Sequence, residues 1–324
     1  MKTIYHFSGA GNDFVVIDGR EGDVSAFREV PRIEALCRDY KTDGLMILGM
    51  PGQAGQDEEV SAVPDREVSA GQDVMADPDR PSVDFTMEFY NPDGSGGMMC
   101  GNGGRCIVAF ADYLGIRPAA GERTAEGVTA APGVFLFRAP DGLHTGEILE
   151  RPEDGLWTVR IKMIDVQGIT PMLGGYFLNT GTRHFVKFVD DVEKVDVETE
   201  GKVLRWDPAF APIGTNVNFV HVAPDGLHVR TFEKGVEGET LACGTGLTAS
   251  AIAAYEISRR RPAGFARNDK APVISTKAGG RMEKSYRLRA RQDWLSVDFT
   301  PGPDDSFTDV YLTGPARLIR VAGA

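Results

Sequence analysis

Hydrophobic and polar residues alternate over several stretches of the chain, which is the pattern of half-buried β-strands. Residues 2–20 predict a strand, a glycine-rich turn and a second strand, and residues 83–91 predict another strand followed by a turn. The same alternation recurs at 157–166, 286–300 and 309–323. The pattern therefore predicts a protein built mainly of strands.

Three segments show helical spacing instead. Residues 28–41 place apolar side chains three or four positions apart and carry Pro31, which suits a first helical turn. Residues 106–115 predict a short helix ended by glycine, and 247–260 predict a longer one. A Cys-Gly-x-Gly motif precedes each of these last two helices.

The two motif-bearing helices divide the chain into halves of similar plan, residues 1–150 and 151–324. Many strands with one principal helix per half indicate an α+β fold rather than an alternating βαβ sheet. Residues 51–83 are rich in glycine, proline and acidic residues and poor in large apolar ones. We expect a flexible insertion there, outside any core.

Composition narrows the class of protein. Hydrophobic residues make up 42% and charged residues 25% of the chain, which is ordinary for a globular protein. The net charge of −12 disfavours a nucleic-acid partner, because phosphate binding needs clustered Lys and Arg. No apolar run is long enough to span a membrane and no secretory signal is evident, so we expect a cytoplasmic protein with no membrane partner.

The four cysteines show neither C-x-x-C nor zinc-ligand spacing, so we expect no disulfide framework and no metal. Cys37 and Cys106 accompany apolar neighbours and are expected to be small buried hydrophobes. Cys100 and Cys243 directly precede the glycines of the two motifs. These two are the candidate reactive thiols.

A Cys-Gly-x-Gly motif at the start of a helix combines two chemical properties. The helix N-terminus presents unpaired N–H groups and a partial positive charge, so it can hold a carboxylate, and glycines allow close approach. The same field is expected to lower the pKa of the adjacent thiol. Two thiols facing one carbon could remove a proton from one face and supply one to the other. The expected outcome is inversion at a carbon that bears hydrogen.

The chain resembles the diaminopimelate epimerase family, whose members are racemase-type enzymes that use no pyridoxal phosphate. The resemblance runs in the family's order over nearly the whole chain, and the two Cys motifs with "GNDF" are specific to the superfamily. The matching stretches are 9–18, 43–48, 90–106, 179–186, 214–220, 232–246 and 312–316.

The resemblance implies two similar lobes, each a mostly antiparallel sheet wrapped around a central helix, with the active site in the cleft between them. The last strand could return to the first lobe. The resemblance also implies an amino-acid substrate and no cofactor, and it suggests a homodimer. Cys100 and Cys243 would be the base and acid pair.

The remaining site residues are also transferred from the family. A backbone cradle would hold the substrate carboxylate, side-chain amides would hold the rest of the substrate, and a glutamate would lie near the second thiol and the distal ammonium. A histidine would lie near the first thiol and assist its proton transfer. These positions are Gly101, Asn102, Gly244 and Thr245 for the cradle, Asn12, Asn91 and Asn216 for the amides, then Glu233 and His184.

Four features depart from the usual family pattern: Ser8 for a histidine, Thr182-Arg183 for Asn-Pro, Lys234 for an arginine that would clamp the distal carboxylate, and the long 51–83 connection. Lysine is not equivalent to arginine at a bidentate carboxylate site. Because the changes at Thr182 and Lys234 concern the far end of the substrate, we hypothesise that Arg183 swings into the cleft and supplies the lost guanidinium.

Several alternatives remain open at this stage. The three asparagines could simply stabilise turns and His184 could be structural. The chain could be a related cofactor-independent amino-acid racemase or epimerase with a different side-chain pocket. It could also be a non-catalytic amino-acid-binding protein, although binding alone does not require two thiols; a metal or redox role has less support still.

Overall fold

The computed structural model describes residues 2–52, 83–96, 99–260, 273–278 and 281–323. Most of the predicted insertion at 51–83 therefore lies outside the described residues. The strands of the first half are β1 (Thr3–Gly9), β2 (Asn12–Asp18), β3 (Gly44–Gly49), β4 (Phe85–Tyr90), β5 (Arg123–Ala125), β6 (Val128–Ala130), β7 (Phe135–Ala139), β8 (Gly142–Glu153) and β9 (Leu156–Lys162).

The later strands are β10 (Ile169–Met172), β11 (Gly175–Asn179), β12 (Arg183–Phe188), β13 (Asn216–Ala223), β14 (Gly226–Glu233), β15 (Gly238–Thr240), β16 (Val273–Ala278), β17 (Arg281–Arg289), β18 (Trp294–Pro301) and β19 (Phe307–Gly323). The α-helices are α1 (Val30–Tyr40), α2 (Gly101–Tyr113), α3 (Val197–Arg205) and α4 (Gly244–Arg260), with short 3₁₀ turns η1 (Ser25–Arg28), η2 (Val192–Lys194) and η3 (Pro208–Phe210). The prediction of a mixed fold made mostly of strands with few helices is confirmed.

Strand pairing forms two rings that share β19. In the first ring, β19 pairs with β1, and pairing continues through β2, β3, β4, β7, β8 and β9 back to β19. In the second, β10 to β14 pair in order, then β14 pairs with β17, β17 with β18 and β18 with β19. A bridge between Val166 and Phe307 brings the chain back to β19 just before β10.

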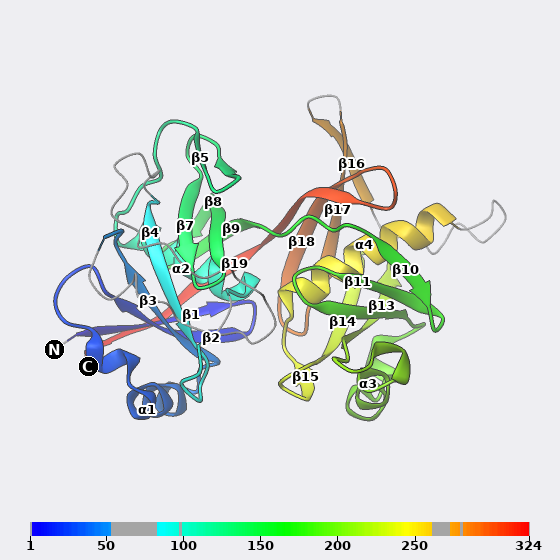
Figure 1. The fold of residues 1–324 in the computed structure, drawn as a ribbon, viewed down its shortest axis with the longest axis horizontal. Coiled ribbons are helices and arrows are strands. Elements are labelled where there is room, and N and C mark those ends of the chain that lie inside the picture. The colour runs from blue at the N-terminus through cyan, green and yellow to red at the C-terminus, as the bar shows by residue number, and fades with distance from the viewer. Residues whose placement is uncertain (1, 53–82, 97–98, 261–272, 279–280, 324) are drawn as a thin grey trace.

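Figure 1 shows two groups of elements side by side, with the long strand β19 crossing from one to the other. Helix α2 contacts β1, β2, β3, β8, β9 and β19, while α4 contacts β11 to β14 and β17 to β19. Strand β19 pairs with β18 over 307–313 and with β9 and β1 over 314–323.

Helix α2 is buried around its whole circumference, from Gly101 to Asp112. A helix that is hydrophobic on all sides belongs in a core, and Ile107, Val108 and Phe110 pack there with no exposed surface. Helix α4 is lined with small buried residues, including Ala249, Ala251 and Ala253. These two buried helices carry the candidate site at their N-terminal ends.

Candidate active site

The two cysteine motifs form equivalent helix starts. The carbonyl of Cys100 accepts the first helical bond of α2 from Gly104 at 2.8 Å, and the carbonyl of Cys243 accepts that of α4 from Leu247 at 2.9 Å. Each cysteine therefore occupies the N-cap position of its helix. The sequence predicted this placement, although α2 begins at Gly101 and not at Cys106 as the apolar run indicated.

Each sulfur atom accepts a hydrogen bond from the backbone of its own helix. Gly103 N–H donates to Cys100 Sγ at 3.2 Å, and Gly246 N–H interacts in the same way with Cys243. The caps leave the earlier N–H groups of both helices outside the helical hydrogen-bond ladder. The predicted carboxylate cradle consists of these earlier groups.

The two helix ends meet at glycine. A Cβ atom built on Gly244 would lie 3.6 Å from Gly101 Cα, and a Cβ at either glycine would lie 2.9 Å from Leu312 Cδ2. A Cβ atom at either position would clash with Leu312 Cδ2 and would be in van der Waals contact with the opposite glycine, so no room for a larger side chain remains between the helix ends. The structure thus brings the two motifs together, as the sequence predicted.

The prediction that the helix ends acidify the thiols is wrong for this state of the protein. Burial raises the pKa of Cys100, with only partial opposition from the Gly103 N–H group and the Arg105 charge. Burial also raises the pKa of Cys243, and the nearby Glu233 carboxylate raises it further. Removing a thiolate from water outweighs the stabilisation from the helix end.

Glu233 lies beside the second thiol at the end of β14. Burial raises the pKa of its carboxyl group, while hydrogen bonds from Thr240 and Cys243 oppose that rise. The Thr240 hydroxyl donates to Glu233 Oε2 at 2.8 Å. A carboxyl group of raised pKa next to a thiol is suited to exchanging a proton with it.

His184 is fully buried in β12 and belongs to a directional hydrogen-bond chain. The amide of Asn218 has its oxygen occupied by the Thr231 hydroxyl at 2.9 Å, so its nitrogen donates to His184 Nδ1 at 3.0 Å. The proton of the neutral ring is therefore on Nε2, which lies 2.9 Å from both Thr182 Oγ1 and Thr245 Oγ1. Burial lowers the pKa of His184 to about 3.

The Thr245 hydroxyl continues this chain to the second thiol. Because it accepts from His184, it can donate to Cys243 Sγ at 3.5 Å, an interaction that lowers the thiol pKa. The sequence associated His184 with the first thiol, but the hydrogen bonds of its ring lead to Cys243.

Asn216 connects three residues at the far side of the site. Its side-chain nitrogen donates to Thr182 Oγ1 at 3.2 Å and to the Arg183 carbonyl at 2.8 Å, and its oxygen accepts from the Lys234 backbone at 2.8 Å. The residues that depart from the family pattern here thus share one buried amide. No side-chain partner of Lys234 is found in the part of the chain that the structure describes.

The guanidinium of Arg183 points to a different environment. It donates to the Phe210 carbonyl at 3.2 Å and lies 5.1 Å from the centre of the Phe177 ring. This conformation does not support the hypothesis that Arg183 replaces the missing arginine in the cleft.

The two N-terminal asparagines have different environments. Asn12 accepts a short hydrogen bond from Asn102, which places it at the start of α2. Asn91 instead donates to Ser95 Oγ at 3.0 Å within a turn, and its backbone pairs with Ser95 as well. Stabilisation of the turn accounts for every hydrogen bond that Asn91 makes to the described residues.

Sequence reasoning missed Arg105 and Asn218. Arg105 has no exposed surface and donates to Asn102 Oδ1 at 2.9 Å, beside the cradle. It is the charged residue of an otherwise apolar helix start, which is the signal that could have identified it. Asn218 follows Asn216 by two positions on β13, so both point to the same face.

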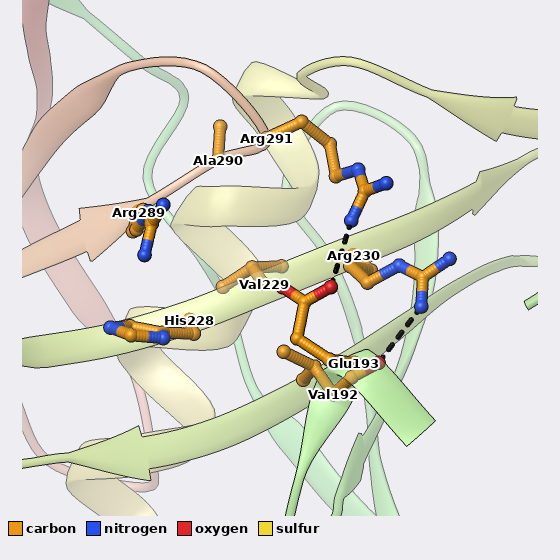
Figure 2. A pocket seen from close by; sticks show the side chains of 8 residues that line it. All are labelled: Val192, Glu193, His228, Val229, Arg230, Arg289, Ala290 and Arg291. Atoms are coloured by element: carbon orange, nitrogen blue, oxygen red, sulfur yellow. Dashed lines mark hydrogen bonds and ion pairs between the residues drawn. The ribbon is translucent and has the colours of Figure 1, made fainter. Parts of the chain in front are cut away.

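Figure 2 shows a separate polar hollow over η2, β14 and the connection from β17 to β18. Two of its arginines belong to ion pairs: Arg291 lies 3.3 Å from Glu193, and Arg230 lies 2.6 Å from Glu239. None of the predicted site residues lines this hollow. Among the described residues there is neither a cluster suited to a metal ion nor a helix able to cross a bilayer.

The fold places the chain in a class of proteins that includes an amino-acid epimerase. The structure of a hydroxyproline epimerase from Agrobacterium vitis, with bound trans-4-OH-L-proline, superposes with a TM-score of 0.55. The match covers 99% of this chain and 90% of that one at 14% sequence identity, so it shows a shared fold.

The sequence comparisons identify the family. The diaminopimelate epimerase model matches residues 176–286. A diaminopimelate epimerase of Flavobacterium psychrophilum is 31% identical over 98% of this chain and 97% of its own length. A diaminopimelate epimerase of Chlorobaculum tepidum is 32% identical over 96% of this chain and 97% of its own length. The chain belongs to the diaminopimelate epimerase family, as its sequence motifs predicted.

Proposed function

We propose that this chain interconverts LL- and meso-2,6-diaminopimelate by proton transfer at Cα, without a cofactor. The reaction would serve lysine and peptidoglycan-precursor biosynthesis. The observation that carries the proposal is the pair of cysteine N-caps on two helices whose first glycines are in near contact. Membership of the family supports diaminopimelate as the substrate.

The substrate carboxylate would bind where the two helices begin. The cradle would consist of the N–H groups of Gly101, Asn102, Gly244 and Thr245, of which Asn102 N–H also interacts with the Cys100 sulfur, and both helix dipoles favour an anion there. Holding the carboxylate strongly would also stabilise the charge that develops on it when Cα loses its proton. The backbone thus supplies the stabilisation that a cofactor supplies in other racemases.

The proton transfer requires one thiolate and one thiol. The thiolate forms a new S–H bond as the Cα–H bond breaks, and the opposite thiol gives its proton to the other face of the same carbon. Afterwards the protonation states of the two sulfurs are exchanged, so the reverse reaction starts from the product state. Glu233 would exchange the Cys243 proton, and the Thr245 hydroxyl would stabilise that sulfur as a thiolate.

The two groups of elements would act as lobes, each with its sheet around α2 or α4, and the substrate would enter a cleft between them. Cys243 is only 7% exposed, so entry requires the helix ends to separate and catalysis requires them to close again. Closure would exclude water, which strengthens the interactions with the carboxylate. The shared strand β19 would be the hinge that keeps the lobes in register.

The far end of the substrate would meet Asn216, Lys234 and Thr182. The ammonium of Lys234 would pair with the distal carboxylate as a single charge, without the two-point geometry of an arginine. This difference favours one second candidate, a racemase of the same superfamily acting on an amino acid with another side chain.

The test is an epimerisation assay with LL-diaminopimelate in deuterium oxide, with monoamino acids and proline derivatives assayed in parallel. We expect solvent deuterium at Cα of diaminopimelate and turnover of that substrate above all others. Preferred turnover of a monoamino acid or a proline derivative would establish the second candidate instead.

The two-thiol mechanism predicts that Cys100→Ala and Cys243→Ala each abolish epimerisation, by at least about a thousandfold, because each removes an essential proton carrier. The matched control is Cys37→Ala, which removes a buried cysteine packed against α1 neighbours. That variant should retain its activity. Full activity in either site variant would contradict the mechanism.

A further inference from the structure

Arg105 is a buried cation with no carboxylate partner among the residues that the structure describes. Its side chain is fully buried one turn into α2. The guanidinium donates to the carbonyls of Gly101 at 3.2 Å, Gly9 at 3.3 Å and Pro315 at 3.3 Å. Burial lowers the pKa of Arg105 to about 10, so the group remains charged near neutral pH.

Cross-linking alone does not account for an arginine at this position. The three carbonyls belong to β1, α2 and β19, so the side chain does tie these elements together. Neutral donors could serve carbonyls equally well, whereas a buried charge that forms no ion pair is unfavourable, and the Asp293 carboxylate acts on it only without direct contact. An arginine in this position therefore favours the binding of an anion nearby.

The fourth hydrogen bond of Arg105 is directional. A guanidinium can only donate, so its bond to Asn102 fixes the oxygen of that amide toward Arg105. Asn102 Nδ2 then faces Asn12 Oδ1 and the carbonyl of Ala242, which is 3.1 Å away and directly precedes Cys243. The Asn102 oxygen thus faces a donor and its nitrogen faces two acceptors, so every contact of the amide is consistent with this orientation.

The orientation passes on to Asn12. Since Asn12 Oδ1 accepts from Asn102, its Nδ2 group faces away as a donor, and no partner for it is found among the described residues. Asn12 is half-buried at the start of β2, next to the N-terminus of α2. Arg105 therefore determines which end of the Asn12 amide is available at the site.

We propose that Arg105 is a positioning residue that aligns Asn102 and Asn12 toward the substrate carboxylate and supplies a buried positive charge for the anions of the site. Those anions are the carboxylate and the Cys100 thiolate. Its charge lowers the pKa of Cys100 against the effect of burial. The carboxylate part of the proposal rests on the proposed function, while the thiolate part does not.

Two substitutions separate the charge of Arg105 from its geometry. Arg105→Met keeps the chain length and removes the charge, whereas Arg105→Lys keeps the charge and loses the planar set of donors. Arg205 provides the matched control, because it is also buried and bonds a carbonyl, that of Ile213 at 3.2 Å, but pairs with Glu237 at 3.1 Å.

The first measurement is the rate of alkylation of Cys100 by iodoacetamide at pH 9, followed by peptide mass spectrometry and requiring no substrate. We expect about a tenfold slower reaction in Arg105→Met, equivalent to a pKa rise of one unit, and a rate within twofold in Arg105→Lys. A merely structural role predicts faster alkylation because a loosened core exposes the thiol. Arg205→Met should leave the Cys100 rate unchanged.

The second measurement is the steady-state kinetics of LL-diaminopimelate. Arg105→Lys should raise KM about tenfold with a smaller change in kcat, because Asn12 and Asn102 lose their alignment. Unchanged or faster alkylation of Cys100 in Arg105→Met would overturn the proposal that the Arg105 charge stabilises the thiolate. An unchanged KM in Arg105→Lys would overturn the proposal that Arg105 aligns Asn12 and Asn102. If neither the native protein nor any variant turns over diaminopimelate, the proposed function fails. The alkylation rates still show whether the Arg105 charge stabilises the Cys100 thiolate, because that measurement needs no substrate.

If Arg105→Met does not fold, Arg105→Gln provides a second neutral variant with a shorter polar side chain. Its Cys100 should also be alkylated about tenfold more slowly, and an unchanged rate would again overturn the proposed effect of the Arg105 charge on the thiolate.

Discussion

At the scale of single residues, the site is determined by the direction of hydrogen bonds. Asn218 has one amide and three buried partners, which are Thr231, Phe185 and His184. These partners leave one orientation of the amide and hence one neutral tautomer of His184. The imidazole therefore serves as a fixed donor toward the Thr182 and Thr245 hydroxyls, both 2.9 Å from Nε2, and its low pKa keeps it neutral near pH 7.

Replacing Asn218 with aspartate should change the protonation of His184. A carboxylate in this place accepts from Nδ1 and favours the imidazolium, so the pKa of His184 should rise from about 3 by at least about two units. The titration can be followed in ¹⁵N spectra of the histidine rings. Asn218→Leu, which adds no charge, should leave the pKa low, and an Asp variant that titrates like the native protein would refute the tautomer assignment.

The sequence identified the residues of the site more reliably than their contacts. The motifs predicted that Cys100 and Cys243 begin two helices, and the structure confirms both positions. The sequence could not predict that burial would raise both thiol pKa values, because burial depends on the packing of distant elements. Arg105 was missed for the same reason: its carbonyl partners Gly9 and Pro315 are distant in sequence.

At the scale of secondary structure, α2 is held at its far end by a single carboxylate. Asp112 accepts from Trp157 Nε1 at 2.9 Å, from Arg151 at 2.6 Å and from Arg117 at 3.0 Å. Burial alone would raise the pKa of Asp112, but these hydrogen bonds and charges lower it overall. The arginines also offset the unfavourable placement of an acidic side chain at a helix C-terminus.

Replacing Asp112 with alanine should lower the free energy of unfolding by about 3 kcal/mol, because the buried Trp157 N–H group loses its acceptor and the ion pairs disappear. Arg151→Ala should cost less than about 1 kcal/mol, since that side chain is half exposed. Urea unfolding of both variants measures the difference. Equal losses would show that the carboxylate is not the anchor.

Helix boundaries reveal where local patterns are insufficient. The amphipathic pattern at 28–41 matched α1, and a left-handed Lys41 ends that helix. Helix α3 was not predicted, because its nine residues contain few apolar side chains and its packing against β13 and β14 supplies the stability. Its capping residue, Asp196, accepts from the Thr199 N–H group and was the available local signal.

At the scale of the whole molecule, β19 makes the two groups of elements parts of one sheet. Phe307, Val310 and Leu312 are buried where it pairs with β18, and Ala316 is buried where it pairs with β9. Alternation over 309–323 predicted a strand, but the pairing of its two halves with different groups of strands depends on the partners and could not be read from the pattern.

The shared strand predicts one cooperative unfolding transition. Trp157 reports on the first group, while Trp206 and Trp294 report on the second, so variants retaining a single tryptophan can follow each group during urea unfolding. We expect coincident midpoints, and Ala316→Asp should lower both because it places a charge in a buried strand. Separate midpoints in the native background would show that β19 does not couple the groups.

The same strand constrains the order in which the chain can fold during synthesis. The ring that contains β1 stays open between β1 and β9 until residues 314–323 have left the ribosome, after every other strand of both rings has been made. Until then β1 and β9 present unpaired edges, which are the usual sites of aggregation. A slow final stage of translation would therefore prolong the exposure of these strand edges. Substitutions near the end of β19 should reduce the yield of soluble protein more than they reduce the stability of the finished protein.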